Sequence, residues 1–316
     1  MSTEKAPKVS VSILTYDQKD IVGEAIESAL AQVADFPIEI RIGDDYSTDG
    51  TRDVIARYRD AHPDRIFLNL QPRRPTGIPG RLNNMTNLVS CRGEYIALLD
   101  GDDFWTDPHK LQGQVDRLDA EPGLGGAAHD AIVVDERGLK IADYRSLPRA
   151  RARKVLQLAD LFDIGTPPTS SFMFRRALID DLPRWFEDIP ATDVALYFFA
   201  MRGGGVYFEP ATQMAYRRLS TSIMGHMRSH TIYKRNAWRL ATANILADNA
   251  PELRHVRNFR AFHKHLQGIG HLEDKRYAAA LLAAAQTFAI QPMRVPAYLG
   301  AAKRLGQARL RSRTDR

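Results

Sequence analysis

The sequence has a single cysteine, Cys91, among its 316 residues, and it has no long apolar run. One cysteine forms no internal disulfide and excludes a zinc site built from several thiolates. We expect this thiol to be buried and inert. The apolar stretch 277–290 is too short to cross a bilayer, and the N-terminal residues carry no apolar segment of the secretory type. These features predict a cytoplasmic protein.

An excess of acidic residues is also absent, since the net charge is +6 at pH 7. Apolar residues recur at helical spacing near the C-terminus, at Val295, Tyr298, Leu299, Ala302 and Leu305. Basic residues cluster beside them, at Lys303, Arg304, Arg309, Arg311 and Arg313. Such a segment can lie on the inner face of an anionic membrane, or it can pack on its own domain with solvated charges. No nucleic-acid partner is expected.

Strand and helix signals alternate along the first half of the chain. Apolar runs of strand length lie at 9–14, 38–42, 66–70 and 95–99. Apolar residues with helical spacing lie between them, at 21–30, 51–58 and 81–89. Asp107 and Pro108 predict a further helix, as its cap and first residue. This order predicts an α/β fold with a mostly parallel sheet and helices on both faces.

The second half of the chain is less regular. Strands are predicted at 127–134, 139–144, 169–174 and 206–217, and a helix at 193–201. From about residue 230 the pattern is helical. We therefore predict two domains, an α/β domain over 1–225 and a helical C-terminal region over 226–316.

Three carboxylates follow the fourth predicted strand, in the sequence Asp100-Gly101-Asp102-Asp103. Ligands of α/β sheets bind at the carboxyl ends of strands. Three neighbouring carboxylates repel one another, and a hard cation such as Mg²⁺ or Mn²⁺ relieves that repulsion. Taken alone, an acidic loop is more often a turn or a helix cap. Taken with the motifs below, it predicts a cation that holds a diphosphate.

Several motifs, in order between about residues 8 and 223, resemble the large inverting glycosyltransferase family 2. They are Val11-Ser12-Ile13-Leu14-Thr15-Tyr16-Asp17, the helix 23–32, the Asp-Asp-x-Ser-x-Asp-x-Thr pattern from Asp44, and 93–103. The stretch 104–111 is similar to the branch that acts in bacterial surface-polysaccharide assembly. The resemblance implies the GT-A fold, a nucleotide-binding α/β sandwich, here with a C-terminal helical appendage.

The resemblance also implies roles on the donor side. Thr15 and Asp17 would line the nucleotide pocket, although Asp17 is equally suited to cap the following helix. Asp44 would accept a hydrogen bond from the imide N–H of a uracil base. Arg81 would face the base or the phosphates, unless it is a surface arginine.

In the family's acidic element, Asp102 would coordinate the metal directly. Asp100 would bind the donor ribose or a metal-bound water. Asp103 would instead fix the loop by accepting backbone N–H groups. The metal, Mn²⁺ or Mg²⁺, neutralises charge on the leaving diphosphate.

Asp193 falls where the family has its general base, which takes a proton from the acceptor hydroxyl. Without the resemblance, a helix cap is the more common role for such a residue. Ser170 and Ser171 would bind sugar hydroxyls or pack in a strand, and Trp105 would line the acceptor pocket or pack on the next helix. Leu219 replaces a histidine that is common in the family, and His226 or His230 would be its substitutes. Either histidine is otherwise a surface residue.

We therefore expect a metal-dependent inverting transferase that moves a sugar from a nucleoside diphosphate, UDP above all, to a hydroxyl of a glycan or lipid-linked acceptor. Two alternatives remain. A sugar nucleotidyltransferase would need a glycine-rich loop after the first strand, which 15–19 lacks. An inactive glycan-binding scaffold would not need Asp100, Asp102 and Asp193. The sequence leaves the transferred sugar, the acceptor and the oligomeric state open.

Overall fold

The computed structural model describes residues 6–72, 78–144, 154–162, 166–219, 232–273 and 276–290. The chain divides into two compact units. The first comprises Met1–Leu158, Ile164–Leu182 and Leu196–Arg218, and the second comprises Ala159–Asp163, Pro183–Ala195 and Leu219–Arg316. Within the described ranges, every helix is too short or too polar to cross a membrane.

Among its described residues, the first unit contains a sheet of ten strands. They are β1 (Val9–Thr15), β2 (Ile38–Asp44), β3 (Ile66–Leu70), β4 (Tyr95–Asp100), β5 (Phe104–Trp105), β6 (Gly126–Val134), β7 (Lys140–Asp143), β8 (Val155–Leu156), β9 (Met173–Arg175) and β10 (Val206–Arg217). Its helices are α1 (Val22–Leu30), α2 (Thr51–Ala61), α3 (Arg81–Ser90) and α4 (Lys110–Ala120), with the 3₁₀ helices η1 (Thr169–Ser171) and η2 (Arg176–Ile179). The four strands and three helices predicted in the first 100 residues are confirmed.

The order of the sheet is β3-β2-β1-β4-β9-β6-β10-β5, with β7 paired to β6 and β8 paired to β10. The block from β3 to β4 is parallel throughout, and β6 is parallel to β10. Antiparallel pairing enters through the short strands β5, β7, β8 and β9. The predicted α/β fold with a mostly parallel central sheet is thus confirmed.

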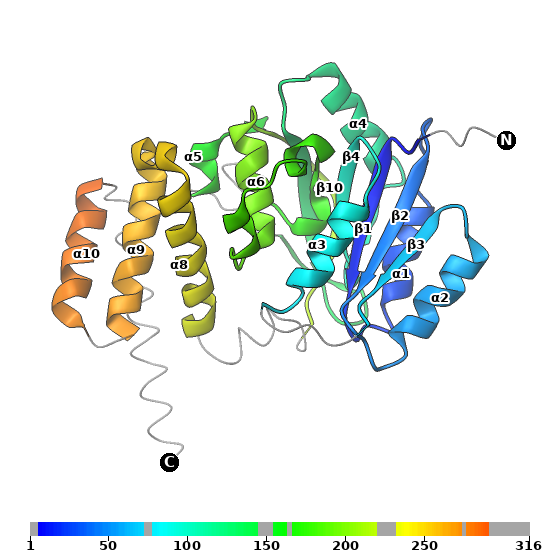
Figure 1. Cartoon of the computed structure of the whole chain (residues 1–316), viewed down its shortest axis with the longest axis horizontal. Helices are drawn as coiled ribbons and strands as arrows, with labels where there is room; N and C mark the ends of the chain where they lie inside the picture. Colours follow the sequence, from blue (N-terminus) through cyan, green and yellow to red (C-terminus); the bar gives the residue numbers. More distant parts are fainter. Residues whose placement is uncertain are drawn as a thin grey trace, which may run out of the picture. The chain divides into compact units, whose positions relative to one another are not determined.

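The two faces of the parallel block differ in chemistry. Val9, Val11 and Ile13 of β1 point into an apolar core that includes residues of α1 and α4. Ser10 and Ser12 of β1 point to the other face, and Ser12 accepts a hydrogen bond there from Asn87 of α3 at 2.8 Å. Successive side chains of a strand point to opposite faces, so these contacts place α1 and α4 on one face and α3 on the other. Figure 1 shows α3 in front of β1 and β2 in that view.

Two local predictions are wrong. The segment predicted as one strand over 169–174 forms η1 and only then enters β9. Helix α4 begins at Lys110, with His109 as its N-cap, and not at Pro108. Asp107 instead accepts the backbone N–H of His109 at 2.8 Å, which makes a turn before the helix.

The second unit is mainly helical. It contains α8 (Ile232–Asn249), η4 (Pro251–His255), α9 (Arg257–Glu273) and α10 (Tyr277–Ile290), together with η3 (Arg184–Glu187). Helices α5 (Leu158–Leu161) and α6 (Thr192–Arg202) each contain residues assigned to both units. Within this unit α9 packs on both α8 and α10. His226, His230 and the basic C-terminal segment from Val295 lie outside the described residues.

Candidate active site

The carboxyl ends of β1, β2 and β4 meet at one edge of the sheet. Strand β1 lies between β2 and β4. The strands that follow β1 in sequence are therefore placed on opposite sides of it, β2 and β3 on one side and β4 on the other. Such switch points open a crevice where α/β proteins bind ligands. In the register, Thr15 pairs with Asp44 and Leu14 pairs with Asp100. The sheet therefore brings Thr15, Asp44 and Asp100 together, as the sequence predicts.

Backbone hydrogen bonds tie the two neighbouring loops to the end of β1. The N–H of Asp45 donates to the Thr15 carbonyl at 3.0 Å, and the N–H of Gly101 donates to the Leu14 carbonyl at 2.8 Å. Gly101 has no space for a side chain, because a Cβ there would lie 2.9 Å from that same Leu14 carbonyl oxygen and 2.4 Å from Oε1 of Gln18. The glycine inside the acidic motif thus permits this close approach of the two chains.

The side chain of Asp17 holds the loop that follows β2. Its Oδ1 accepts the backbone N–H of Thr48 at 2.8 Å, and its own N–H donates to Ser47 Oγ at 2.9 Å. Asp17 has a left-handed backbone with φ 48°, which aspartate tolerates better than most residues. Helix α1 begins after Ile21 and has no side-chain cap. The alternative that Asp17 caps this helix is therefore wrong.

Asp44 is fully buried at the end of β2. Its carboxylate accepts the backbone N–H of Ser47 at 3.1 Å and the hydroxyl of the same residue. It also accepts Nε of Arg52 at 2.5 Å, and Arg52 in turn donates to the Gln71 carbonyl. Three donors thus occupy the group that we predict to read the base, and direct contact with a base requires one of them to move.

Arg81 is the first residue of α3 and is half-buried. The preceding residue, Gly80, donates its N–H to Oδ2 of Asp45 at 3.2 Å. This bond brings the N-terminus of α3 to the loop after β2, and therefore to the nucleotide side of the crevice. Two other arginines that precede β4, Arg73 and Arg74, lie outside the described residues.

The three acidic residues after β4 form one cluster. Ligand atoms of Asp100, Asp102 and Asp103 all lie within 4.8 Å of one another. Burial raises the pKa of Asp102, an effect that the guanidinium of Arg217 partly opposes. Burial also raises the pKa of Asp103 well above its usual range, and the charges on Asp102 and Asp100 add to the shift. Repulsion between these groups is thus a property of the folded chain.

Asp103 is the structural centre of this loop and is only 2% exposed. Its Oδ1 accepts the backbone N–H of Arg217 at 2.9 Å, and its Oδ2 accepts the hydroxyl of Ser170 at 2.6 Å. Ser170 Oγ in turn accepts the backbone N–H of Asp100 at 2.9 Å. Asp103 therefore fixes the loop, as predicted, whereas Asp100 and Asp102 remain partly exposed.

The roles of Ser170 and Arg217 were not identified from the sequence. Ser170 and Ser171 are both fully buried in η1, and Ser171 Oγ donates to the Pro168 carbonyl at 2.7 Å. Trp105 is buried and packs on α4, where Nζ of Lys110 lies 4.0 Å from its ring centre. Of the alternatives for Trp105, packing on the following helix is the one that the structure bears out.

Asp193 is the second residue of α6 and belongs to the second unit. Helix α6 begins at Thr192, so Asp193 lies in the first turn and not at the cap position. Its role as a base stays a prediction.

The donor set of the acidic cluster suits a hard divalent cation. Carboxylate oxygens are the ligands that Mg²⁺ and Mn²⁺ favour, and thiolate or imidazole groups are absent from the cluster. Burial raises the Asp103 pKa most, and a bound cation would offset the like-charge repulsion from Asp102 and Asp100 that adds to this rise. The residues present therefore fit a resident metal.

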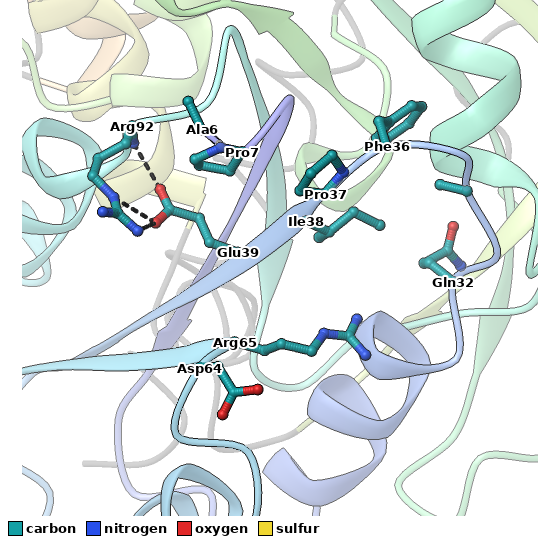
Figure 2. Close-up of a pocket in the computed structure, with 11 residues that line it drawn as sticks. Ala6, Pro7, Gln32, Phe36, Pro37, Ile38, Glu39, Asp64, Arg65 and Arg92 are labelled. Atoms are coloured by element: carbon teal, nitrogen blue, oxygen red, sulfur yellow. Dashed lines mark hydrogen bonds and ion pairs between the residues drawn. The ribbon is translucent and has the colours of Figure 1, made fainter. Parts of the chain in front are cut away.

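A separate cavity of about 490 Å³ lies at the opposite, amino-terminal edge of the strands. Figure 2 shows its lining, with Pro7 before β1, Pro37 and Ile38 at the start of β2, and Glu39 joined to Arg92. Glu39 is already fully engaged, since it also pairs with Arg41 at 2.8 Å. We place the chemistry at the other edge, because the partly exposed carboxylates gather there.

A model of the family described as Glycosyl transferase family 2 matches residues 10–182. The chain belongs to this family. An uncharacterized protein of Mycobacterium tuberculosis is 34% identical to this family 2 chain over 211 residues, covering 66% of the chain and 58% of that relative. The chain thus matches little more than half the length of this relative. The Escherichia coli glucosyltransferase WfaP, named for UDP-Glc and α-D-GlcNAc-diphosphoundecaprenol, is 35% identical over 113 residues, 36% of this chain and 42% of its own.

Solved structures resemble this family 2 chain in fold. Staphylococcus aureus TarS 1–349 in complex with UDP-GlcNAc has a TM-score of 0.62 at 18% identity, covering 92% of this chain and 83% of that one. The Pyrobaculum calidifontis mannosyltransferase PcManGT, in complex with GDP-Man and Mn²⁺, has a TM-score of 0.60 at 20% identity, covering 95% and 87%. The predicted GT-A fold is thus confirmed.

Proposed function

We propose that this chain is a metal-dependent, inverting glycosyltransferase of surface-polysaccharide synthesis. It takes a sugar from a UDP-linked donor and transfers it to a hydroxyl of a glycan or lipid-linked acceptor. The observation that carries the proposal is the carboxylate cluster of Asp100, Asp102 and Asp103 at the switch point of the sheet. The name of WfaP supports the donor and acceptor classes, and its match covers 36% of this chain.

In this proposal Asp102 and Asp100 hold Mn²⁺ or Mg²⁺, with Asp102 as the direct ligand. When bound, the cation supplies charge that offsets the negative charge on the leaving diphosphate. Asp102 suits this role because its carboxylate is partly exposed, whereas Asp103 is buried and engaged inside the loop. The chain's own contribution is to hold the two ligands rigidly at the crevice.

The nucleoside of the donor lies, in this proposal, between the ends of β1 and β2. Thr15 and Asp17 line one side, and Arg81 approaches from the start of α3. Asp44 reads the base either directly or through Arg52, which is partly exposed and bonded to it. A carboxylate that accepts from an imide N–H selects uracil over cytosine, because cytosine lacks that donor.

Asp193 is, in this proposal, the general base. Inversion requires one group to remove the proton from the acceptor hydroxyl as that oxygen attacks the anomeric carbon opposite the diphosphate. A carboxylate is a group that can accept this proton. The two-domain division at residue 225 and the contact of the C-terminal segment with a membrane remain predictions.

Calorimetry with UDP tests the proposal directly. We expect wild-type protein to bind UDP more tightly with Mn²⁺ than with EDTA. Asp102→Asn should abolish that difference while the fold survives, because a partly exposed loop carboxylate contributes little to the core. Asp116→Asn, which removes an exposed carboxylate on α4, is the matched control and should leave the difference intact. Equal UDP affinity with Mn²⁺ and with EDTA in the wild type would refute the metal site.

Turnover separates the enzyme from an inactive scaffold. The wild-type protein with Mn²⁺ should slowly hydrolyse UDP-sugars in the absence of acceptor, because water can replace the acceptor hydroxyl. Release of the nucleoside diphosphate is measured across a panel of donors that differ in sugar and base. Tight UDP binding without release from any donor would leave the chain as a nucleotide-binding scaffold.

A further inference from the structure

Arg217 lies at the end of β10, and its side chain is only 1% exposed. Its Nε donates to the carbonyl oxygen of Asp102 at 2.9 Å, and its Nη1 donates to the carbonyl oxygen of Glu136 at 2.9 Å. Its Nη2 pairs with Oε2 of Glu24, on α1, at 2.7 Å. Its backbone N–H donates to the carboxylate of Asp103. One residue thus joins the acidic loop to α1 and to the turn after β6.

An arginine beside a cluster of carboxylates suggests direct binding of the donor diphosphate, because a guanidinium pairs well with phosphate oxygens. The structure argues against that role for Arg217. All three of its side-chain nitrogens already donate to protein oxygens, and its guanidinium also packs 5.4 Å from the ring centre of Phe104. The side chain is therefore committed to the interior of the unit.

We propose that Arg217 is a positioning residue for the cation site. By holding the carbonyl of Asp102 and the carboxylate of Asp103, it fixes the direction in which the Asp102 side chain faces the crevice. The inference rests on the proposed function, since it takes the acidic cluster as the site of Mn²⁺ or Mg²⁺. Residues that do not bind the metal themselves but orient a metal ligand commonly lower the metal affinity by about 10- to 100-fold when they are removed.

Arg217→Lys is the decisive variant. Lysine keeps the positive charge, but a single ammonium cannot reach the three acceptors that the planar guanidinium joins. Mn²⁺ is titrated into the full chain with equimolar UDP, and the free ion is measured by electron paramagnetic resonance. We expect binding of Mn²⁺ to weaken about 10-fold or more. The affinity for UDP in EDTA should stay unchanged, because the contacts to β1 and β2 are intact.

Arg175→Lys is the matched control. Arg175 also lies inside the first unit and also ties carbonyl groups together, those of Leu124 at 2.8 Å and Leu118 at 2.6 Å. It lies on β9 beside the amino-terminal end of β4, where its Nη1 donates to the hydroxyl of Tyr95. Its loss should lower the unfolding temperature much as the loss of Arg217 does. Affinity for Mn²⁺ should not change.

The outcomes separate the two hypotheses. Absence of Mn²⁺ binding in the wild type overturns both the cation site and the role of Arg217. If the wild type binds Mn²⁺ and Arg217→Lys keeps this affinity within about twofold, only the role of Arg217 is overturned. The same holds if Arg217→Lys and Arg175→Lys lose the same amount of affinity. If Arg217→Lys does not fold, Glu24→Gln decides, because it releases one end of Arg217 at a half-exposed position. We expect about a threefold loss of Mn²⁺ affinity, and no loss overturns the inference.

Discussion

Ser170→Ala removes one hydroxyl that two parts of the acidic loop share. The Oγ donates to Oδ2 of Asp103 at 2.6 Å and accepts the N–H of Asp100 at 2.9 Å. After the substitution a buried carboxylate oxygen loses its donor and a backbone N–H loses its acceptor. Leaving a buried polar group unsatisfied costs about 1–3 kcal/mol, and charged groups lie at the upper end. We expect the free energy of unfolding to fall by roughly 3–4 kcal/mol.

Ser171→Ala is the neighbouring control, equally buried in η1. Its hydroxyl donates only to the Pro168 carbonyl, which also accepts the backbone N–H of Ser171 at 3.0 Å. That carbonyl stays satisfied, so the cost should be about 1 kcal/mol. Urea midpoints at unchanged slope measure both losses. Mn²⁺-dependent UDP binding should weaken only in Ser170→Ala, and equal effects of the two variants would refute the role of Ser170 in the loop.

Three further outcomes are expected. Glu39→Gln should lower the urea midpoint at pH 7. Burial raises the Glu39 pKa, but hydrogen bonds from Arg41 and Ser10 more than offset this effect. The pKa of Glu39 is therefore lowered from 4.5. That stabilisation is complete above pH 4.5 and is lost as the pH falls through the folded pKa, so the two midpoints should converge in acid. Burial raises the pKa of the Cys91 thiol to about 12, so mass spectrometry should find no alkylation in native protein at pH 8 and full alkylation in urea. Asp193→Asn should lower turnover by about 100-fold or more with unchanged UDP binding, and near wild-type transfer would identify another base.

The parallel half of the sheet was predictable because its signals are local. Runs such as 9–14 and 95–99 are strand-length and apolar, and the helices between them have a regular apolar spacing. The carboxyl ends of parallel strands share one edge, so the meeting of Thr15, Asp44 and Asp100 follows from topology alone. The predicted burial of Cys91 is also confirmed.

The partners of each polar side chain were not predictable in the same way. Asp17 was equally suited to cap a helix next to it, yet it bonds Thr48, which is 31 residues away. Asp107 has the sequence context of a cap, but its carboxylate is used by a turn and by Gln213. Side-chain hydrogen bonds of this kind depend on which loops the completed fold brings together. Propensities within one segment do not contain that information.

The acidic loop has a consequence for the order of folding. The nucleotide side of the crevice is built from neighbours in the first part of the chain, such as Asp45 and Thr15. The loop after β4, in contrast, is held by Ser170, 67 residues later, and by Arg217, 114 residues later. Contacts of large sequence separation form late, because closing a long loop costs entropy before the contact can stabilise it. In refolding, we therefore expect the early strands to acquire protection from hydrogen exchange before the chain acquires affinity for Mn²⁺.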